Sequence, residues 1–141
     1  MRVIELVFVR QLAVVPQELW PWISDPTHIE QWASLSITPL TPGEGGDPSA
    51  VGATRTVQMG PLQMTELVVR AEEPALFVYS ITEGGFLRTH EATVSLSPTT
   101  QGTQLTWTVS LEPAIPGTGW LLRRSLTRQF ARDLSTLDAM L

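Results

Sequence analysis

The sequence VIELVFVR at residues 3–10 and the sequence VVPQELWPWISDP at residues 14–26 decide the fold. The first is apolar in the manner of a strand, which we expect to end at Leu12. Pro16 suits the first position of a helix, because the N–H that proline lacks would have no partner there. The Asp-Pro pair at 25–26 repeats this arrangement as N-cap and first residue of a second short helix. The chain is therefore expected to open with a strand and two short helices.

The middle of the chain is rich in strands and turns. Pro21 is expected to kink or end the first short helix, and the Gly- and Pro-rich residues 41–52 are expected to form a loop. Short turns separate the apolar segments that follow, a spacing typical of an antiparallel meander. The predicted strands are residues 53–59, 62–72, 75–83, 86–97 and 103–112.

The last segment of the chain has helical periodicity. From Trp120 to Leu141, apolar residues recur at steps of three and four. This stripe consists of Leu122, Leu126, Phe130, Leu134, Leu137 and Leu141. A chain of 141 residues predicts a single domain over residues 1–141. We expect an α+β fold, in which a curved antiparallel sheet of six to seven strands grips the long C-terminal helix, with a pocket between them.

Composition excludes several classes of protein. The absence of cysteine excludes disulfides, thiolate catalysis and cysteine metal sites, and the only two histidines, His28 and His90, lack the spacing of zinc ligands. The formal net charge of −5 makes nucleic acid an unfavourable partner. The chain has neither a signal-peptide layout nor an apolar run of about 18 residues. We therefore expect a cytoplasmic protein with no metal, no cofactor and no stable membrane insertion.

Two hairpin turns predict which side chains share the concave face of the sheet. A two-residue loop at residues 84–85 would pair Tyr79 with His90 and place Arg88 on the same face. The next hairpin loop continues this face to Trp107. The two hairpins agree on one apolar face that also carries polar side chains.

Four short patterns support a resemblance to a known family. They are VPQELW at residues 15–20, SDP at 24–26, Trp32, and GTQLTW at 102–107. Together with the terminal amphipathic helix, they resemble the SRPBCC superfamily, in its START-like polyketide cyclase/dehydrase and lipid transport group. The resemblance covers nearly the whole chain and implies a helix-grip fold around a hydrophobic ligand cavity. Members bind lipids, sterols, quinones or polyketides, and a minority catalyse cyclisation or dehydration.

Arginine side chains are expected on the concave face. Arg10 and Arg88 are in step with its apolar residues, and Arg55 joins them if its strand turns the same way. An ionised arginine in an apolar cavity is costly unless it is paired. Glu66 and Glu83 are the candidate partners.

The facing of Glu66 stays open at this stage. Even-length turns at both ends of its strand turn Glu66 inward. Hydrophobicity alone favours Leu67 and Val69 at the inward positions. The two arguments contradict each other, and residue patterns do not decide between them.

Tyr79, His90 and Glu66 are the candidate catalytic residues. A cross-strand tyrosine and histidine can serve as acid and base for enolisation of a ketone, with an arginine to stabilise the enolate oxygen. The alternative interpretation is a polar spot near the rim of the cavity. The residues that we expect to contact a ligand are Arg10, Trp32, Arg55, Met59, Met64, Tyr79, Arg88, His90, Trp107, Trp120 and Phe130.

These observations favour binding of a small hydrophobic ligand, such as a lipid, a quinone or a polyketide-like molecule, in an internal cavity. The first alternative is an enzyme of the polyketide cyclase/dehydratase type that uses Tyr79 and His90, or Glu66, as acid and base. A further alternative is a protein-interaction module. Such a module could use residues 41–52 or the helical arginines Arg124, Arg128 and Arg132, and it would need no cavity.

Overall fold

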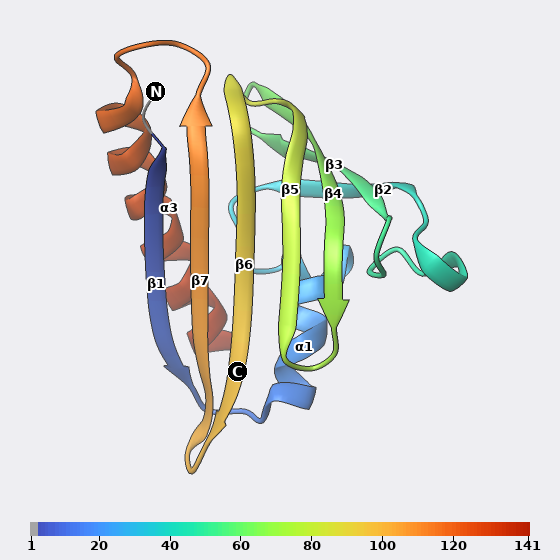
Figure 1. Ribbon diagram of the computed structural model, residues 1–141. Helices are drawn as coiled ribbons and strands as arrows, with labels where there is room; N and C mark the ends of the chain where they lie inside the picture. Colours follow the sequence, from blue (N-terminus) through green and yellow to red (C-terminus); the bar gives the residue numbers. More distant parts are fainter. Residues whose placement is uncertain (1–2) are drawn as a thin grey trace.

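An antiparallel sheet with three α-helices makes up the computed structural model, which describes residues 3–141 (Figure 1). The elements in chain order are β1 (Ile4–Leu12), α1 (Pro16–Ser24), α2 (Pro26–Ile29), β2 (Ser36–Thr41), the 3-10 helix η1 (Glu44–Gly46), β3 (Thr54–Met59), β4 (Leu62–Glu72), β5 (Leu76–Gly84), β6 (Leu87–Thr99), β7 (Gly102–Pro113) and α3 (Gly119–Met140). The order of strands across the seven-stranded sheet is β1-β7-β6-β5-β4-β3-β2. The predicted α+β architecture is confirmed.

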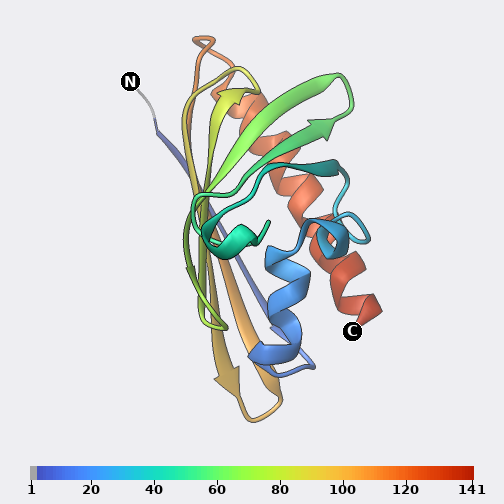
Figure 2. The same ribbon diagram turned by 90° about the vertical axis from the view of Figure 1, so that its right-hand side faces the viewer.

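The helices gather on one side of this sheet. A view turned by 90° shows α1 and α3 on the same face, while the end of the sheet that contains β3 and β4 bends toward α3 (Figure 2). The long helix α3 packs mainly on β1 and β7. Its apolar stripe provides the contact: Leu134 and Leu137 are fully buried, and the other stripe residues are partly buried against the core. The sheet and α3 therefore enclose the interior, as the order of elements predicts.

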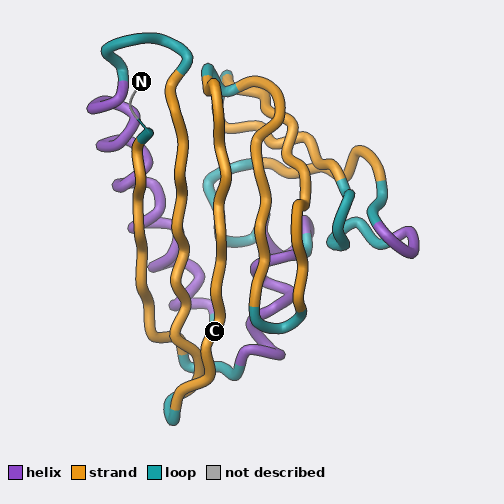
Figure 3. The backbone as a smooth tube through the Cα atoms, in the orientation of Figure 1, coloured by secondary structure: helices purple, strands orange, loops and turns teal. Residues whose placement is uncertain are grey.

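Short loops join the strands from β3 to β7 (Figure 3). In β7, apolar residues alternate with Thr and Ser, and the apolar set is buried. The hairpin between β6 and β7 has the predicted register, with Val94 opposite Trp107 and Leu96 opposite Leu105. Alternation and loop length together thus fix which face of these strands is buried.

The prediction for the short helices is confirmed in one part and incomplete in another. The carboxylate of Asp25 accepts a hydrogen bond from the Thr27 N–H at 3.0 Å and caps α2, as expected. Pro21 does not end α1, which continues to Ser24. The strand β2 is missing from the prediction, because Ile37 is its only buried residue and Pro39 interrupts the pattern.

The turn between β5 and β6 lies one residue later than predicted. Gly85 and Phe86 form it, both with positive φ, and Tyr79 pairs with Ala92. This shifts the pairing by two residues, which preserves the face of each side chain. His90 therefore still lies on the same face as Tyr79, as its neighbour along the diagonal.

Candidate functional site

A cavity of about 160 Å³ lies between the concave face of the sheet, α2 and α3. Most of its lining is apolar. The predicted ligand-contact residues that line it are Trp32, Arg55, Met59, Met64, Tyr79, His90, Trp107 and Phe130. All three candidate catalytic residues, Tyr79, His90 and Glu66, also line it. The fold thus brings together, in one space, residues from the α2–β2 connection, the five strands β3 to β7, and α3.

Three of the predicted ligand-contact residues, Arg10, Arg88 and Trp120, do not line this cavity. Arg10 reaches the side of α3, where its Nη2 donates to the Ala131 carbonyl at 3.4 Å. Trp120 is 68% exposed, because it lies in the first turn of α3 away from the apolar stripe. Arg88 and Trp120 instead line a separate surface groove.

Arg88 is turned outward by an irregularity in β6. The register with β7 shifts between Leu87 and Thr89, so alternation breaks there and Leu87 lines the cavity instead. The Arg88 guanidinium is mostly exposed and lies 3.6 Å from the carboxylate of Glu112. Glu83, the second candidate acid, is exposed and is absent from the lining.

Helix α3 contributes polar residues that sequence reasoning missed. Gln129 and Asp133 line the cavity beside Phe130 of the apolar stripe. The buried carboxylate of Asp133 accepts two hydrogen bonds from Ser34, from its N–H at 3.0 Å and its hydroxyl at 2.5 Å. Their spacing of four residues, next to the stripe, is the signal that could have placed them on the inner side of the helix.

The buried charges of the site form a pair. Arg55 is 1% exposed and Glu66 is 7% exposed, and they are directly opposite residues of β3 and β4. Nη2 and Nε of Arg55 donate to the same oxygen of Glu66, Oε1, at 2.6 and 3.1 Å. The open question about Glu66 is thereby answered: it faces inward.

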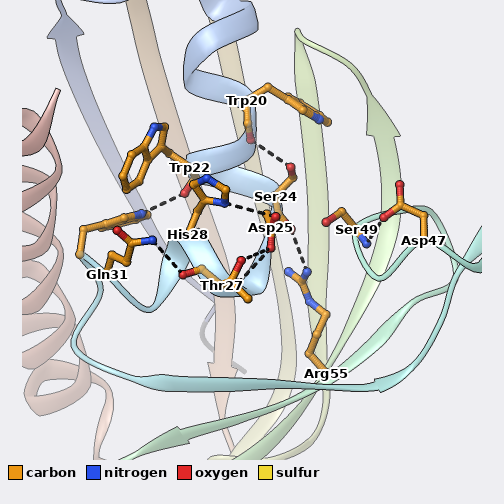
Figure 4. A network of polar contacts seen from close by, with 11 residues as sticks. Trp20, Trp22, Ser24, Asp25, Thr27, His28, Gln31, Asp47, Ser49 and Arg55 are labelled. Carbon is orange, nitrogen blue, oxygen red and sulfur yellow. Dashed lines mark hydrogen bonds and ion pairs between the residues drawn. The ribbon is translucent and has the colours of Figure 1, made fainter.

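The end of α1 supplies a further partner for the Arg55 guanidinium (Figure 4). Nη1 of Arg55 donates to the backbone carbonyl of Ser24 at 3.0 Å, at the end of α1. The Trp32 indole N–H donates to the carbonyl of Trp22 at 2.9 Å, which holds the Trp32 ring against the cavity. Backbone carbonyls of α1 thus hold a guanidinium and an aromatic ring in the wall of the cavity.

Burial and the ion pair act in opposite directions on Glu66. Burial raises the pKa of this carboxyl, and the adjacent Arg55 guanidinium lowers it. The contact of 2.6 Å places a guanidinium that stays protonated in proteins against the carboxyl, and this favours the ionised form of Glu66. We therefore treat the pair as ionised and without net charge.

Tyr79 presents a neutral phenol to the cavity. Burial raises its pKa, and the negative charge of Glu66 raises it further, so the hydroxyl keeps its proton. The Trp107 indole N–H donates to the Tyr79 oxygen at 3.1 Å. Because that bond uses the oxygen as an acceptor, the hydroxyl proton remains free to be donated.

His90 presents a neutral imidazole. Burial lowers its pKa to about 4. Its Nδ1 accepts a hydrogen bond from the Ile81 N–H at 3.2 Å, so the proton of the neutral ring lies on Nε2. The ring centroids of Tyr79 and His90 are 5.8 Å apart. The cavity lining therefore offers two neutral hydrogen-bond donors and a paired carboxylate.

A family model for polyketide cyclase/dehydrase and lipid transport proteins matches residues 4–141. The chain belongs to this family. The match supports the resemblance of the sequence to the SRPBCC superfamily. No curated protein matches the chain.

Solved structures of this START-like architecture superpose on nearly the whole chain. A START superfamily protein from Mycobacterium smegmatis has a TM-score of 0.80 and 14% identity, over 98% of this chain and 95% of that one. Protein MLL2253 from Mesorhizobium loti has a TM-score of 0.69 and 20% identity, over 96% and 97%. Protein CV1439 from Chromobacterium violaceum has a TM-score of 0.72 and 16% identity, over 96% and 95%. At these identities, the likeness establishes the helix-grip fold.

Within residues 3–141, no helix is both long enough and apolar enough to cross a bilayer.

Proposed function

We propose that this member of the family binds a small hydrophobic ligand inside the cavity. The observation that supports this proposal is an apolar space, enclosed by sheet and helix, whose lining contains only a few polar side chains among residues 3–141. Ligand sites are commonly of this kind, with mostly apolar walls and a small number of placed polar groups. A lipid, a quinone or a polyketide-like molecule meets this requirement.

The volume limits the part of a ligand that fits. Engineered cavities of about 150 Å³ bind benzene, whereas pockets for drug-sized ligands measure about 300–1,000 Å³. A volume of about 160 Å³ therefore admits one ring or a short chain. A larger lipid or polyketide would bind through one portion, or with α3 displaced from the sheet.

Nuclear magnetic resonance with isopropylbenzene as a probe tests this proposal. We expect the probe to shift the signals of the Trp32 and Trp107 indole N–H groups, because both rings line the cavity. Leu126→Trp should remove these shifts by filling the space with a larger side chain. Leu121→Trp is the matched control, since Leu121 lies on the same helix but is 54% exposed. Unchanged indole signals in the parent protein would contradict the proposal.

An enzymatic role is a second candidate, because Tyr79, His90 and Glu66 line the same cavity. A polyketide cyclase/dehydratase-type reaction would use one of them as a base and another as an acid. Proton exchange on acetophenone tests this directly: a base in the cavity would replace the methyl protons by deuterium in D₂O. Exchange no faster than in buffer would leave binding as the function. The interaction-module alternative receives no support from the interior, which is not fully packed.

A further inference from the structure

We infer that the ligand carries an uncharged oxygen acceptor, such as a ketone or quinone carbonyl, which meets the Tyr79 hydroxyl and the His90 Nε2–H. This inference rests on the proposed function and concerns the same cavity. It names the chemistry of the ligand's polar end. It also excludes a carboxylate at that end, which the family resemblance alone leaves open.

The His90 side chain has a hydrogen-bond donor without a partner among residues 3–141. Among residues 3–141, the only fully enclosed side-chain polar atom without a hydrogen bond is Nδ1 of His28, next to the Asp25 carboxylate. Nε2 of His90 makes no hydrogen bond in this part of the chain, so it must reach open space. His90 lines the cavity, and the inference places this donor toward a ligand there.

The hydrogen bonds that Tyr79 and His90 accept leave one proton on each side chain to be donated. The Tyr79 oxygen accepts from Trp107 and donates to no described residue. The Nδ1 atom of His90 is occupied by the Ile81 N–H, which fixes the donor on the other nitrogen. Each group can therefore donate one more hydrogen bond, and a ligand that covered these donors without offering an acceptor would bind at a cost in free energy. A carbonyl oxygen has two lone pairs and can accept from both.

The charged residues of the lining disfavour an anionic ligand. Among residues 3–141, Arg55 is the only arginine in the lining, and three of its N–H groups are already used by Glu66 and the Ser24 carbonyl. The Glu66 carboxylate also lines the cavity and would repel an anion bound there. The two arginines that could have met a carboxylate, Arg10 and Arg88, lie outside the cavity. A charged ligand oxygen would thus be buried without a counter-ion, which is costly.

Three probes with equal numbers of heavy atoms separate these requirements: acetophenone, isopropylbenzene and benzoate. In the parent protein at pH 7, we expect acetophenone and isopropylbenzene to shift the Trp32 and Trp107 indole signals. Benzoate should bind at least about tenfold more weakly than acetophenone. Affinities are obtained by titration of these signals in the full chain.

The decisive variant is Tyr79→Phe, which removes one donor and keeps the ring. The net value of one neutral hydrogen bond predicts an affinity loss of about fivefold for acetophenone. Isopropylbenzene should bind Tyr79→Phe with unchanged or improved affinity, which controls for altered packing. Trp120→Phe is a control outside the cavity, and it should change neither affinity.

Each outcome has one meaning. Selective loss of acetophenone affinity in Tyr79→Phe supports the inference. Equal loss for both probes, no loss for either, or benzoate affinity equal to that of acetophenone would overturn it. If isopropylbenzene does not bind the parent protein, the proposed function itself fails, and this outcome is distinct from failure of the ligand class.

Discussion

Breaking the buried pair between Arg55 and Glu66 should have consequences that depend on which partner is removed. Removing one partner of a buried ion pair typically costs about 3–5 kcal/mol, because the other charge is left uncompensated. Glu66→Gln leaves an arginine that is 1% exposed and cannot lose its proton. At this chain length, we expect a loss of about 3 kcal/mol and a fall in Tm of roughly 10 °C.

Arg55→Met has a different limit, because the remaining carboxyl can take up a proton. Neutralising a carboxyl of ordinary pKa 4.5 at pH 7 costs about 3 kcal/mol, at about 1.4 kcal/mol for each pH unit. In this variant, burial raises the pKa of Glu66 without opposition. A raised pKa in the folded state gives stability that is present at low pH and lost as the pH rises. The penalty should therefore shrink by roughly 2–3 kcal/mol between pH 7 and pH 5.

Urea denaturation of the parent protein and the variants at pH 7 and pH 5 measures these penalties. The double variant Arg55→Met/Glu66→Leu should be more stable than either single variant, because no charge is left behind. Arg70→Met is the surface control: Arg70 pairs with Glu72, both are more than half exposed, and its cost should stay below about 1 kcal/mol. An Arg55→Met penalty that is the same at both pH values would refute the reasoning, as would a double variant that is as unstable as Glu66→Gln.

Two further predictions concern His90 and Asp133. Burial lowers the pKa of His90 to about 4 from an ordinary 6.5. The neutral imidazole therefore contributes fully to the free energy of unfolding above pH 6.5, and this contribution is lost as the pH falls toward 4. His90→Gln should remove about 2–3 kcal/mol of this acid sensitivity in urea denaturation, and an unchanged pH profile would contradict the assignment. Asp133→Asn should weaken the hydrogen bonds to Ser34 and speed amide exchange at Ser34 by about tenfold or more. Asp138→Asn, an exposed change on the same helix, should not, and equal exchange in both variants would show that Asp133 does not hold this segment.

Elements with strong periodicity or short turns could be predicted from the sequence. The apolar stripe of α3 and the hairpin between β6 and β7 are confirmed residue by residue, because loop length and alternation both determine them. The cavity-lining positions of Tyr79 and His90 followed from the same reasoning. A turn misplaced by one residue changed their pairing partners but not their face.

Arg88 shows where this reasoning fails. Alternation assumes an uninterrupted strand, and the shift between Leu87 and Thr89 exchanges an arginine for a leucine at the cavity wall. Nothing in the residue pattern of β6 marks that shift. Arg10 does not line the cavity for another reason. It lies on the inner face of β1, but β1 is an edge strand, and the Arg10 side chain reaches the side of α3.

The facing of Glu66 could have been decided from the sequence by considering Arg55 at the same time. A two-residue turn after Met59 makes Arg55 and Glu66 directly opposite residues, so both charges must lie on the same face. Val57 and Met59 are apolar residues of this strand, and residues two apart share a face, so Arg55 would be expected to face inward with them, and Glu66 with it. Hydrophobicity counted one residue at a time favours Leu67 and penalises Glu66, because it ignores the partner across the strand. The two buried charges form an ion pair, so this part of the cavity wall is polar but carries no net charge.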